Sequence, residues 1–149
     1  VAKVQVLSEQ WRVGKRSFLL LSLLLFPLPV LYFSHNSDLL RDSMVHEITV
    51  HDLKAKRDAG APILLLDVRE PDEVSFVTLP GSVHIPMGEV PGRLHELDPD
   101  KEIIVYCHHG VRSLHVAQFL AQRDFENVAS LAGGIDAWSV AIEPELPRY

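Results

Sequence analysis

Residues 103–112 read Ile-Ile-Val-Tyr-Cys-His-His-Gly-Val-Arg, and this stretch decides the fold. Its first four residues form a short apolar run, which is typical of a buried strand. The following segment, 113–123, carries an apolar stripe at helical spacing, formed by Val116, Ala117, Leu120 and Ala121. The pattern predicts a strand that leads through a tight loop into a helix, with Cys107 as the first residue of the loop.

The segments on both sides repeat this alternation. Strand-like runs occupy residues 48–50, 63–67, 83–85 and 127–131, and helix-like segments occupy 51–58, 71–74, 88–97 and 135–139. Thr49 is expected to cap the first of these helices, and Pro71 suits the first turn of the second. Strands separated by helices predict a parallel sheet whose ligands bind at the carboxyl ends of the strands. We therefore expect a three-layer α/β fold with helices on both faces, the run 63–67 placed centrally, and Cys107 at the carboxyl edge.

The composition limits the classes of function. Of the 149 residues, 47% are hydrophobic and 23% charged, which supports a packed core. The net charge of −6 disfavours nucleic acid as a partner. Cys107 is the single cysteine of the sequence, so an intrachain disulfide and a multi-cysteine zinc site are excluded, and the thiol is either buried or reactive.

The first part of the chain differs from the rest. Residues 1–43 hold five Lys and Arg against three Asp and Glu, and they contain the apolar run 18–33 within a charge-free stretch, 17–37. Spanning a bilayer takes about 20 apolar residues, so this segment predicts a short N-terminal membrane anchor. The basic residues ahead of it would keep the N-terminus in the cytoplasm and place the domain across the membrane.

A second interpretation of the same segment stays open. The chain begins with Val, and Met44 stands just before the globular pattern, so residues 1–43 are equally consistent with an over-extended start of the gene. In that case the protein is expected in the cytoplasm. Both interpretations place one domain at residues 44–149.

The loop after the strand favours a reactive sulfur. A thiol at the first turn of a helix faces backbone N–H groups without partners and the positive end of the helix dipole, so the thiolate is favoured over the thiol. Gly110 permits a backbone bend that lets successive amides converge on one point. Arg112 adds a permanent positive charge at the mouth of this loop. The site is therefore suited to a sulfur nucleophile that meets an anion.

Four blocks of the sequence resemble the rhodanese-like sulfurtransferases. They are Leu-Asp-Val-Arg-Glu at 66–70 with Glu73, Leu-Pro-Gly-Ser-Val-His-Ile-Pro at 79–86, Tyr-Cys-His-His-Gly-Val-Arg-Ser at 106–113, and Leu-Ala-Gly-Gly-Ile-Asp-Ala-Trp at 131–138. The resemblance implies a rhodanese-like fold and a cysteine that takes the outer sulfur of a donor such as thiosulfate. The resulting persulfide passes its sulfur to a thiophilic acceptor such as cyanide or a thiol, which includes thiol proteins.

The resemblance also implies the roles of the loop residues. Cys107 is the nucleophile, and no cofactor is expected. The substrate-binding residues are the loop amides together with the Arg112 guanidinium, and they comprise His108, His109, Gly110, Val111, Arg112 and Ser113. The two histidines replace variable family positions, so the resemblance assigns them no specific role. Where many members have Gly-His-Ile, this chain has Val-Thr-Leu at 77–79, which we do not expect to alter the chemistry.

Other polar residues have structural interpretations. Asp67, Arg69 and Glu73 are expected to form ion pairs and caps, because sulfur transfer from a thiolate needs no paired carboxylate. Ser113 is expected to be a helix N-cap rather than a catalytic hydroxyl. Trp138 and Phe119 are expected in the core. The histidines show neither HxxxH nor HExxH spacing, so no metal site is expected.

Two other functions remain as alternatives. A phosphatase or arsenate reductase on the same fold would use the same cysteine and arginine on a tetrahedral oxyanion. Four residues separate Cys107 from Arg112, whereas the cell-cycle phosphatases of this fold have five, and the shorter loop favours a single sulfur atom over a phosphate. A non-catalytic binding module would usually lack the cysteine or the loop.

Overall fold

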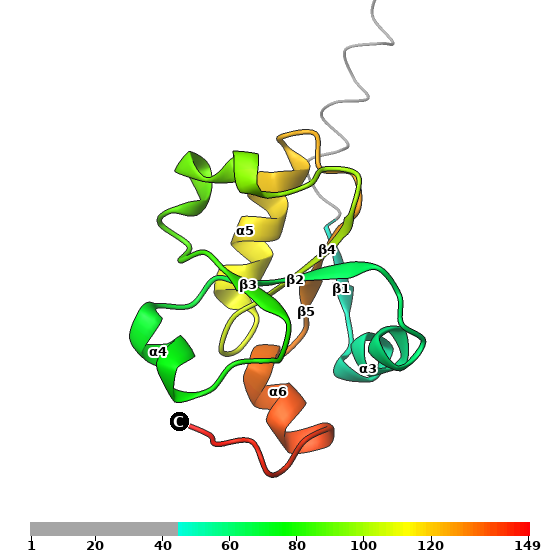
Figure 1. Cartoon of the computed structure of the whole chain (residues 1–149), viewed down its shortest axis with the longest axis vertical. Coiled ribbons are helices and arrows are strands. Elements are labelled where there is room, and N and C mark those ends of the chain that lie inside the picture. Colours follow the sequence, from blue (N-terminus) through cyan, green and yellow to red (C-terminus); the bar gives the residue numbers. More distant parts are fainter. Residues whose placement is uncertain (1–44) are drawn as a thin grey trace, which may run out of the picture. The chain divides into compact units, whose positions relative to one another are not determined.

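A computed structural model describes residues 45–149 (Figure 1). Five strands form one sheet in the order β1-β5-β4-β2-β3, and every pairing between neighbours is parallel. The strands are β1 (His46–Ile48), β2 (Ile63–Asp67), β3 (Ser82–His84), β4 (Glu102–Tyr106) and β5 (Val128–Leu131). The predicted parallel α/β sheet is therefore confirmed. β4 lies at its centre, and β2, the run expected there, lies next to it.

Within residues 45–149, four α-helices connect or follow the strands. They are α3 (Val50–Asp58), α4 (Pro71–Phe76), α5 (Val111–Ala121) and α6 (Gly134–Ala141). The hydroxyl of Thr49 accepts a hydrogen bond of 3.1 Å from the N–H of Asp52, which confirms Thr49 as the cap of α3. Because Val50 is already helical, β1 ends two residues earlier than predicted. Pro71 opens α4 as expected.

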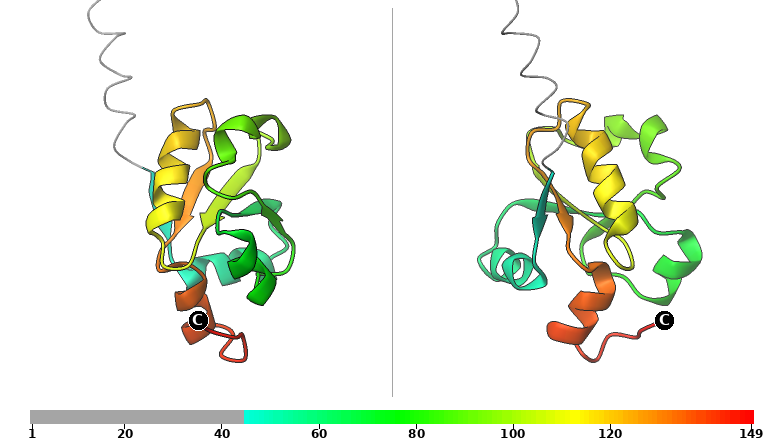
Figure 2. Two further views of the ribbon diagram at one scale, coloured as in Figure 1. Left: turned by 90° about the vertical axis from the view of Figure 1, so that its left-hand side faces the viewer. Right: turned by 180° about the vertical axis from the view of Figure 1, so that it is seen from behind.

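The helices cover both faces of the sheet, as Figure 2 shows, and the side chains of β4 alternate between the two cores. Ile104 and Tyr106 pack on the side of α3 and α6, in a cluster that includes fully buried Trp138. Ile103, Val105 and Cys107 pack on the side of α5. Phe119 is partly buried against this second cluster. The three-layer arrangement is confirmed, and Cys107 belongs to the α5 side.

The prediction of a helix over residues 88–97 is wrong. This segment instead holds two short 3₁₀ helices, η1 (Val90–Gly92) and η2 (Leu94–Glu96). Pro91 has no N–H to donate and is followed by Gly92, so a continuous α-helical ladder cannot run through this point.

The hydrophobic segment 17–37 and the boundary near Met44 lie outside the described residues. Within residues 45–149, no helix combines the length and the apolar character needed to cross a membrane.

The parallel register brings the ends of the inner strands together. Asp67, the last residue of β2, lies opposite Tyr106 of β4 and opposite His84 of β3. The segments that leave β2 and β4 therefore start side by side at the carboxyl edge of the sheet. One of them leads to Arg69 and α4, and the other leads to Cys107.

Candidate active site

The sulfur of Cys107 lies at the amino end of α5. The residue is only 2% exposed, and Sγ accepts a hydrogen bond from the backbone N–H of Gly110 at 3.1 Å. The positive end of the α5 dipole lies on the same side of the sulfur as this donor. The first N–H groups of a helix have no partner inside it, and no side chain caps α5 at Gly110. The predicted meeting of thiol, glycine and helix end is thus present in the structure.

Gly110 is required by both its conformation and its surroundings. Its φ of +99° lies in the left-handed region, which disfavours residues with a side chain. A Cβ at this position would also come within 3.1 Å of the backbone nitrogen of Gly133. The tight loop therefore packs against the turn between β5 and α6.

The amino end of α6 donates hydrogen bonds to the backbone of the loop that begins at Cys107. The N–H of Ile135 donates to the carbonyl oxygen of Cys107 at 2.9 Å, and the N–H of Asp136 donates to that of His108 at 3.1 Å. Gly134 has a φ of +59°, and a Cβ there would overlap both carbonyl oxygens. The Gly-Gly pair at 133–134 therefore allows a helix end to approach the loop backbone directly.

Ser113 differs from its expected role as an N-cap. Helix α5 starts two residues earlier, at Val111, because the left-handed Gly110 takes the cap position. The Ser113 hydroxyl donates to the carbonyl oxygen of Gly110 at 2.9 Å and lies 3.6 Å from the sulfur of Cys107. It also lies 3.0 Å from the hydroxyl of Ser130. Ser113 is thus a buried neighbour of the sulfur that ties the loop to β5.

Arg112 is paired with the carboxylate of Glu73, a residue for which only a structural role was expected. Its Nη1 and Nη2 donate to the two carboxylate oxygens of Glu73 at 2.7 and 2.6 Å. The hydrogen bonds from Arg112 lower the pKa of Glu73 to about 2. The hydrogen bond with Glu73 raises the pKa of Arg112 in turn. Glu73 therefore belongs to the site as well as to the cap of α4.

The two loop histidines form an aromatic stack with Tyr149. The rings of His108 and His109 are stacked with centroids 3.8 Å apart, and Tyr149 stacks on the other side of His108 at 4.1 Å. Burial, together with the nearby charge of His109, lowers the pKa of His108, so this ring is neutral at neutral pH. The sequence contained no signal for Tyr149, which reaches the loop from the segment after α6. Val111 of the same loop exposes its side chain to solvent.

Asp67 and Arg69 form a fully buried ion pair behind the site. Arg69 donates from Nε and Nη2 to the two carboxylate oxygens of Asp67 at 2.9 and 2.6 Å, and both side chains are 0% exposed. Nη2 of Arg69 also donates to the carbonyl oxygen of Val77 at 2.8 Å. The expected structural role of this pair is confirmed.

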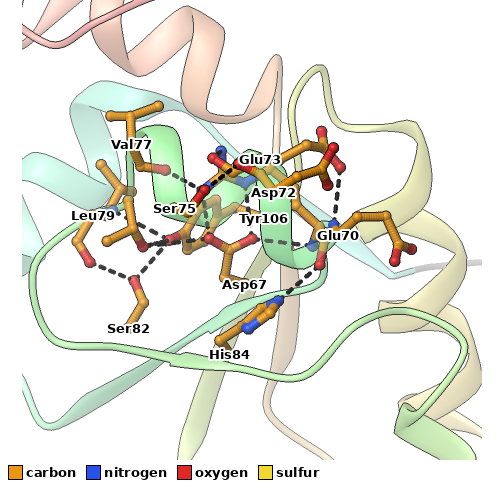
Figure 3. A network of polar contacts seen from close by, with 12 residues as sticks. Asp67, Glu70, Asp72, Glu73, Ser75, Val77, Leu79, Ser82, His84 and Tyr106 are labelled. Carbon is orange, nitrogen blue, oxygen red and sulfur yellow. Dashed lines mark hydrogen bonds and ion pairs between the residues drawn. The ribbon is translucent and has the colours of Figure 1, made fainter.

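The neighbouring hydroxyls join the same network (Figure 3). The hydroxyl of Tyr106 donates to Ser82 at 2.8 Å, and the hydroxyl of Thr78 lies 3.1 Å from that of Tyr106. Thr78 occupies the place of the histidine found in many family members. Its hydroxyl bonds to the buried network, and among residues 45–149 no hydrogen bond joins Thr78 to Cys107.

No three His, Cys, Asp or Glu side chains of residues 45–149 are grouped so that they could hold a metal ion. One hollow is lined by residues at the amino ends of β4 and β5, among them Lys101, Glu102 and Val128. It lies at the edge of the sheet opposite Cys107, and no cysteine, serine or threonine of the described residues lines it.

Comparison with known sequences places this site in a family. A family profile described as "Rhodanese-like domain" matches residues 49–141, which include Glu73 and the loop 107–113 but not Tyr149. The chain belongs to the rhodanese-like family. A putative sulfurtransferase, YtwF, from Bacillus subtilis is 38% identical over 101 residues, covering 68% of this chain and 97% of the relative. The thiosulfate sulfurtransferase GlpE of Coxiella burnetii is 32% identical, covering 63% of this chain and 84% of that protein.

Solved rhodanese-like structures share the fold. A rhodanese-related protein from Thermoplasma volcanium superimposes with a TM-score of 0.59 at 34% identity, covering 68% of this chain and 95% of that one. The NAD-dependent persulfide reductase of A. fulgidus matches with a TM-score of 0.53 at 34% identity, and the match covers 74% of this chain and 19% of the reductase. The sequence relatives support rhodanese-type sulfur transfer in general. The individual roles expected for the loop residues stay predictions.

Proposed function

We propose that this rhodanese-like protein carries sulfur on Cys107 as a persulfide, taking it from a donor such as thiosulfate and passing it to cyanide or a thiol. The observation that supports this most directly is the position of Sγ, which accepts the Gly110 N–H at 3.1 Å at the amino end of α5. Backbone donors fixed around a sulfur stabilise negative charge on it. The same donors would then serve the outer sulfur of a persulfide.

The two half-reactions balance without a cofactor. The Cys107 thiolate attacks the outer sulfur of thiosulfate, a new S–S bond forms to Cys107, and the donor S–S bond breaks to release sulfite. Cyanide then attacks the outer sulfur of the persulfide, and thiocyanate leaves as the Cys107 thiolate returns. Two successive transfers through a covalent intermediate give ping-pong kinetics.

The loop residues are expected to have two roles. Some bind the transferred sulfur, and others contact the donor or the acceptor. In this proposal the amides from His108 to Ser113, among them the Gly110 N–H that donates to Sγ, hold the sulfur. The Arg112 guanidinium, which is paired with Glu73, would meet the anionic end of a donor. The neutral ring of His108 and its neighbour His109 would face an acceptor that approaches the loop. Small anions and thiols, including thiol proteins, are the partners that this arrangement suits.

The test is a mass measurement on the intact protein. Incubation with thiosulfate should add one sulfur atom, and cyanide should remove it with formation of thiocyanate. Cys107→Ser, which keeps the size and polarity of the side chain, should show neither event. A serine variant that gains the same mass would show that the nucleophile is another residue.

An aryl phosphate assay on the same unmodified protein addresses the phosphatase alternative. The four residues between Cys107 and Arg112 make a narrow ring of amides, so we expect negligible phosphate hydrolysis beside clear thiocyanate formation. Hydrolysis of the aryl phosphate without thiocyanate would replace the sulfurtransferase proposal by the phosphatase.

A further inference from the structure

Glu73 occupies the side of Arg112 that best fits an anion. The two terminal nitrogens of the guanidinium meet the two carboxylate oxygens at 2.7 and 2.6 Å, which is the bidentate arrangement by which arginine also holds sulfonates and phosphates. Side-chain exposure is 33% for Arg112 and 17% for Glu73. Within residues 45–149, no acceptor other than Glu73 is paired with this guanidinium.

Glu73 is held in place from several sides. Its Oε2 also accepts the backbone N–H of Glu70 at 2.9 Å, which closes the first turn of α4 (Figure 3). Its Oε1 accepts the hydroxyl of Tyr149 at 2.9 Å. The Tyr149 oxygen accepts in turn from Nη1 of Arg69, also at 2.9 Å. A chain of contacts therefore connects the buried Asp67–Arg69 pair to the arginine of the loop.

This fixed carboxylate changes what Arg112 offers to a donor. A dianionic donor must either displace Glu73 from the guanidinium or bind beside a negative charge, and both weaken its binding. Because Arg112 lowers the pKa of Glu73 to about 2, the carboxylate is charged throughout the pH range in which a thiolate reacts. Tyr149 keeps its proton, because burial raises its pKa, and it continues to donate to Glu73.

We propose that Glu73 is a specificity-determining residue that weakens the binding of thiosulfate and thereby favours uncharged or singly charged donors, such as the persulfides of small thiols. This proposal rests on the proposed function of Cys107. Tyr149 is a positioning residue in the same arrangement, because it acts on the donor only through Glu73.

The favoured transfer balances in the same way as the thiosulfate reaction. The Cys107 thiolate attacks the outer sulfur of R–S–SH, its new S–S bond forms as the donor S–S bond breaks, and the thiolate RS⁻ leaves. No sulfonate has to be held at Arg112 during this step. The loop amides around Sγ suffice to position the sulfur that moves.

The experiment compares Glu73→Gln with the unchanged protein, using the full chain. Glutamine keeps the size of the side chain and an oxygen for the cap of α4, but it removes the charge that faces Arg112. Asp72→Asn is the matched control, because it removes one charge from the same turn of α4, and no contact between its side chain and Arg112 exists among the described residues. Circular dichroism and denaturant unfolding verify that each variant is folded.

Assays with two sulfur donors distinguish an effect on donor specificity from an effect on activity in general. With thiosulfate and cyanide, Glu73→Gln should lower the KM for thiosulfate about tenfold while kcat changes less than threefold, and Asp72→Asn should leave both unchanged. With the persulfide of N-acetylcysteine methyl ester, which carries no carboxylate, the rate of mass gain at Cys107 should change less than threefold. Tyr149→Phe keeps the ring but loses the hydroxyl, so it should lower the KM for thiosulfate by a smaller factor than Glu73→Gln.

The outcomes are distinguishable. An unchanged KM for thiosulfate in Glu73→Gln, with persulfide still formed on Cys107, overturns the role of Glu73 and leaves the proposed function standing. Equal changes in Glu73→Gln and Asp72→Asn also overturn it, because they would reflect net charge alone. If Glu73→Gln does not fold, an unchanged KM in Tyr149→Phe overturns the proposal. Absence of persulfide with both donors in every protein overturns the proposed function and this inference together.

Discussion

The backbone N–H of Ile135 donates to the carbonyl oxygen of Cys107 at 2.9 Å, so the first turn of α6 is bonded to the residue that carries the sulfur. Cys107 therefore lies between two helix ends. One is the amino end of α5, where the Gly110 N–H donates to Sγ, and the other is the amino end of α6, which bonds the backbone carbonyl. Backbone groups on both sides therefore position Cys107.

Gly134→Ala should disturb this arrangement. A Cβ at Gly134 would overlap the carbonyl oxygens of Cys107 and His108, and the φ of +59° adds backbone strain of about 1–3 kcal/mol. We expect a lower free energy of unfolding and at least a tenfold fall in thiocyanate formation. Gly81→Ala is the control, because its φ of +82° brings similar strain but no atom lies within 4 Å of the added Cβ. A similar loss of activity in both variants would contradict a role for the contact between α6 and the loop.

Arg112→Lys should show whether thiosulfate turnover depends only on the positive charge at position 112 or also on the bidentate geometry of arginine. Lysine keeps the positive charge but cannot bond both oxygens of Glu73 or of a donor anion at once. We expect thiosulfate turnover to fall tenfold or more while the fold survives, as measured by steady-state kinetics and circular dichroism. Arg123→Lys, just beyond the far end of α5, should leave the rate unchanged. A full rate in Arg112→Lys would show that the loop amides suffice.

Arg69→Ala should destabilise the fold strongly. The carboxylate of Asp67 is fully buried, and removal of Arg69 leaves this charge without its partner, at a loss of about 3–5 kcal/mol in the free energy of unfolding. Denaturant unfolding measures the change. Arg148→Ala breaks an ion pair with Asp136 in which Arg148 is 55% exposed, and it should lose at most about 1 kcal/mol. Equal losses would mean that the buried pair contributes no more than a surface pair.

The Arg112–Glu73 pair should lose its contribution to stability in acid. The pKa of Glu73 falls from 4.5 to about 2 on pairing, so the folded protein binds this proton less readily than the unfolded chain. The stabilisation is complete above about pH 4.5 and disappears as the pH falls towards 2. The difference in the free energy of unfolding between the unchanged protein and Glu73→Gln should narrow across this window. The other carboxylates are present in both proteins, so their protonation cancels in this difference. A difference in the free energy of unfolding that stays constant across the window would contradict the role of the pair.

Local sequence signals predicted much of the fold. The apolar runs of β2 and β4 predicted buried strands because a sheet covered on both faces needs apolar residues at successive positions. Thr49 and Pro71 predicted helix starts through local hydrogen bonding and a fixed φ. The 88–97 prediction failed because Pro91 has no N–H for the helical ladder and Gly92 follows it, so the segment forms two short 3₁₀ helices instead. The Ser113 prediction failed because Gly110, three residues before Ser113, already takes the cap position of α5.

The sequence alone predicted Cys107 as the residue that carries the chemistry, because a strand, Cys107, Gly110 and Arg112 follow one another within one short segment. The local conformation of this segment directs the Gly110 N–H at the sulfur. Only the tertiary structure decided what Arg112 contacts. Glu73 is 39 residues away along the chain, and Tyr149 is 76 residues beyond Glu73. Their meeting depends on the parallel order of β2 and β4 and on the path of the segment after α6. Such long-range pairings have no local pattern, because the ends of the strands come together only when the whole sheet has formed.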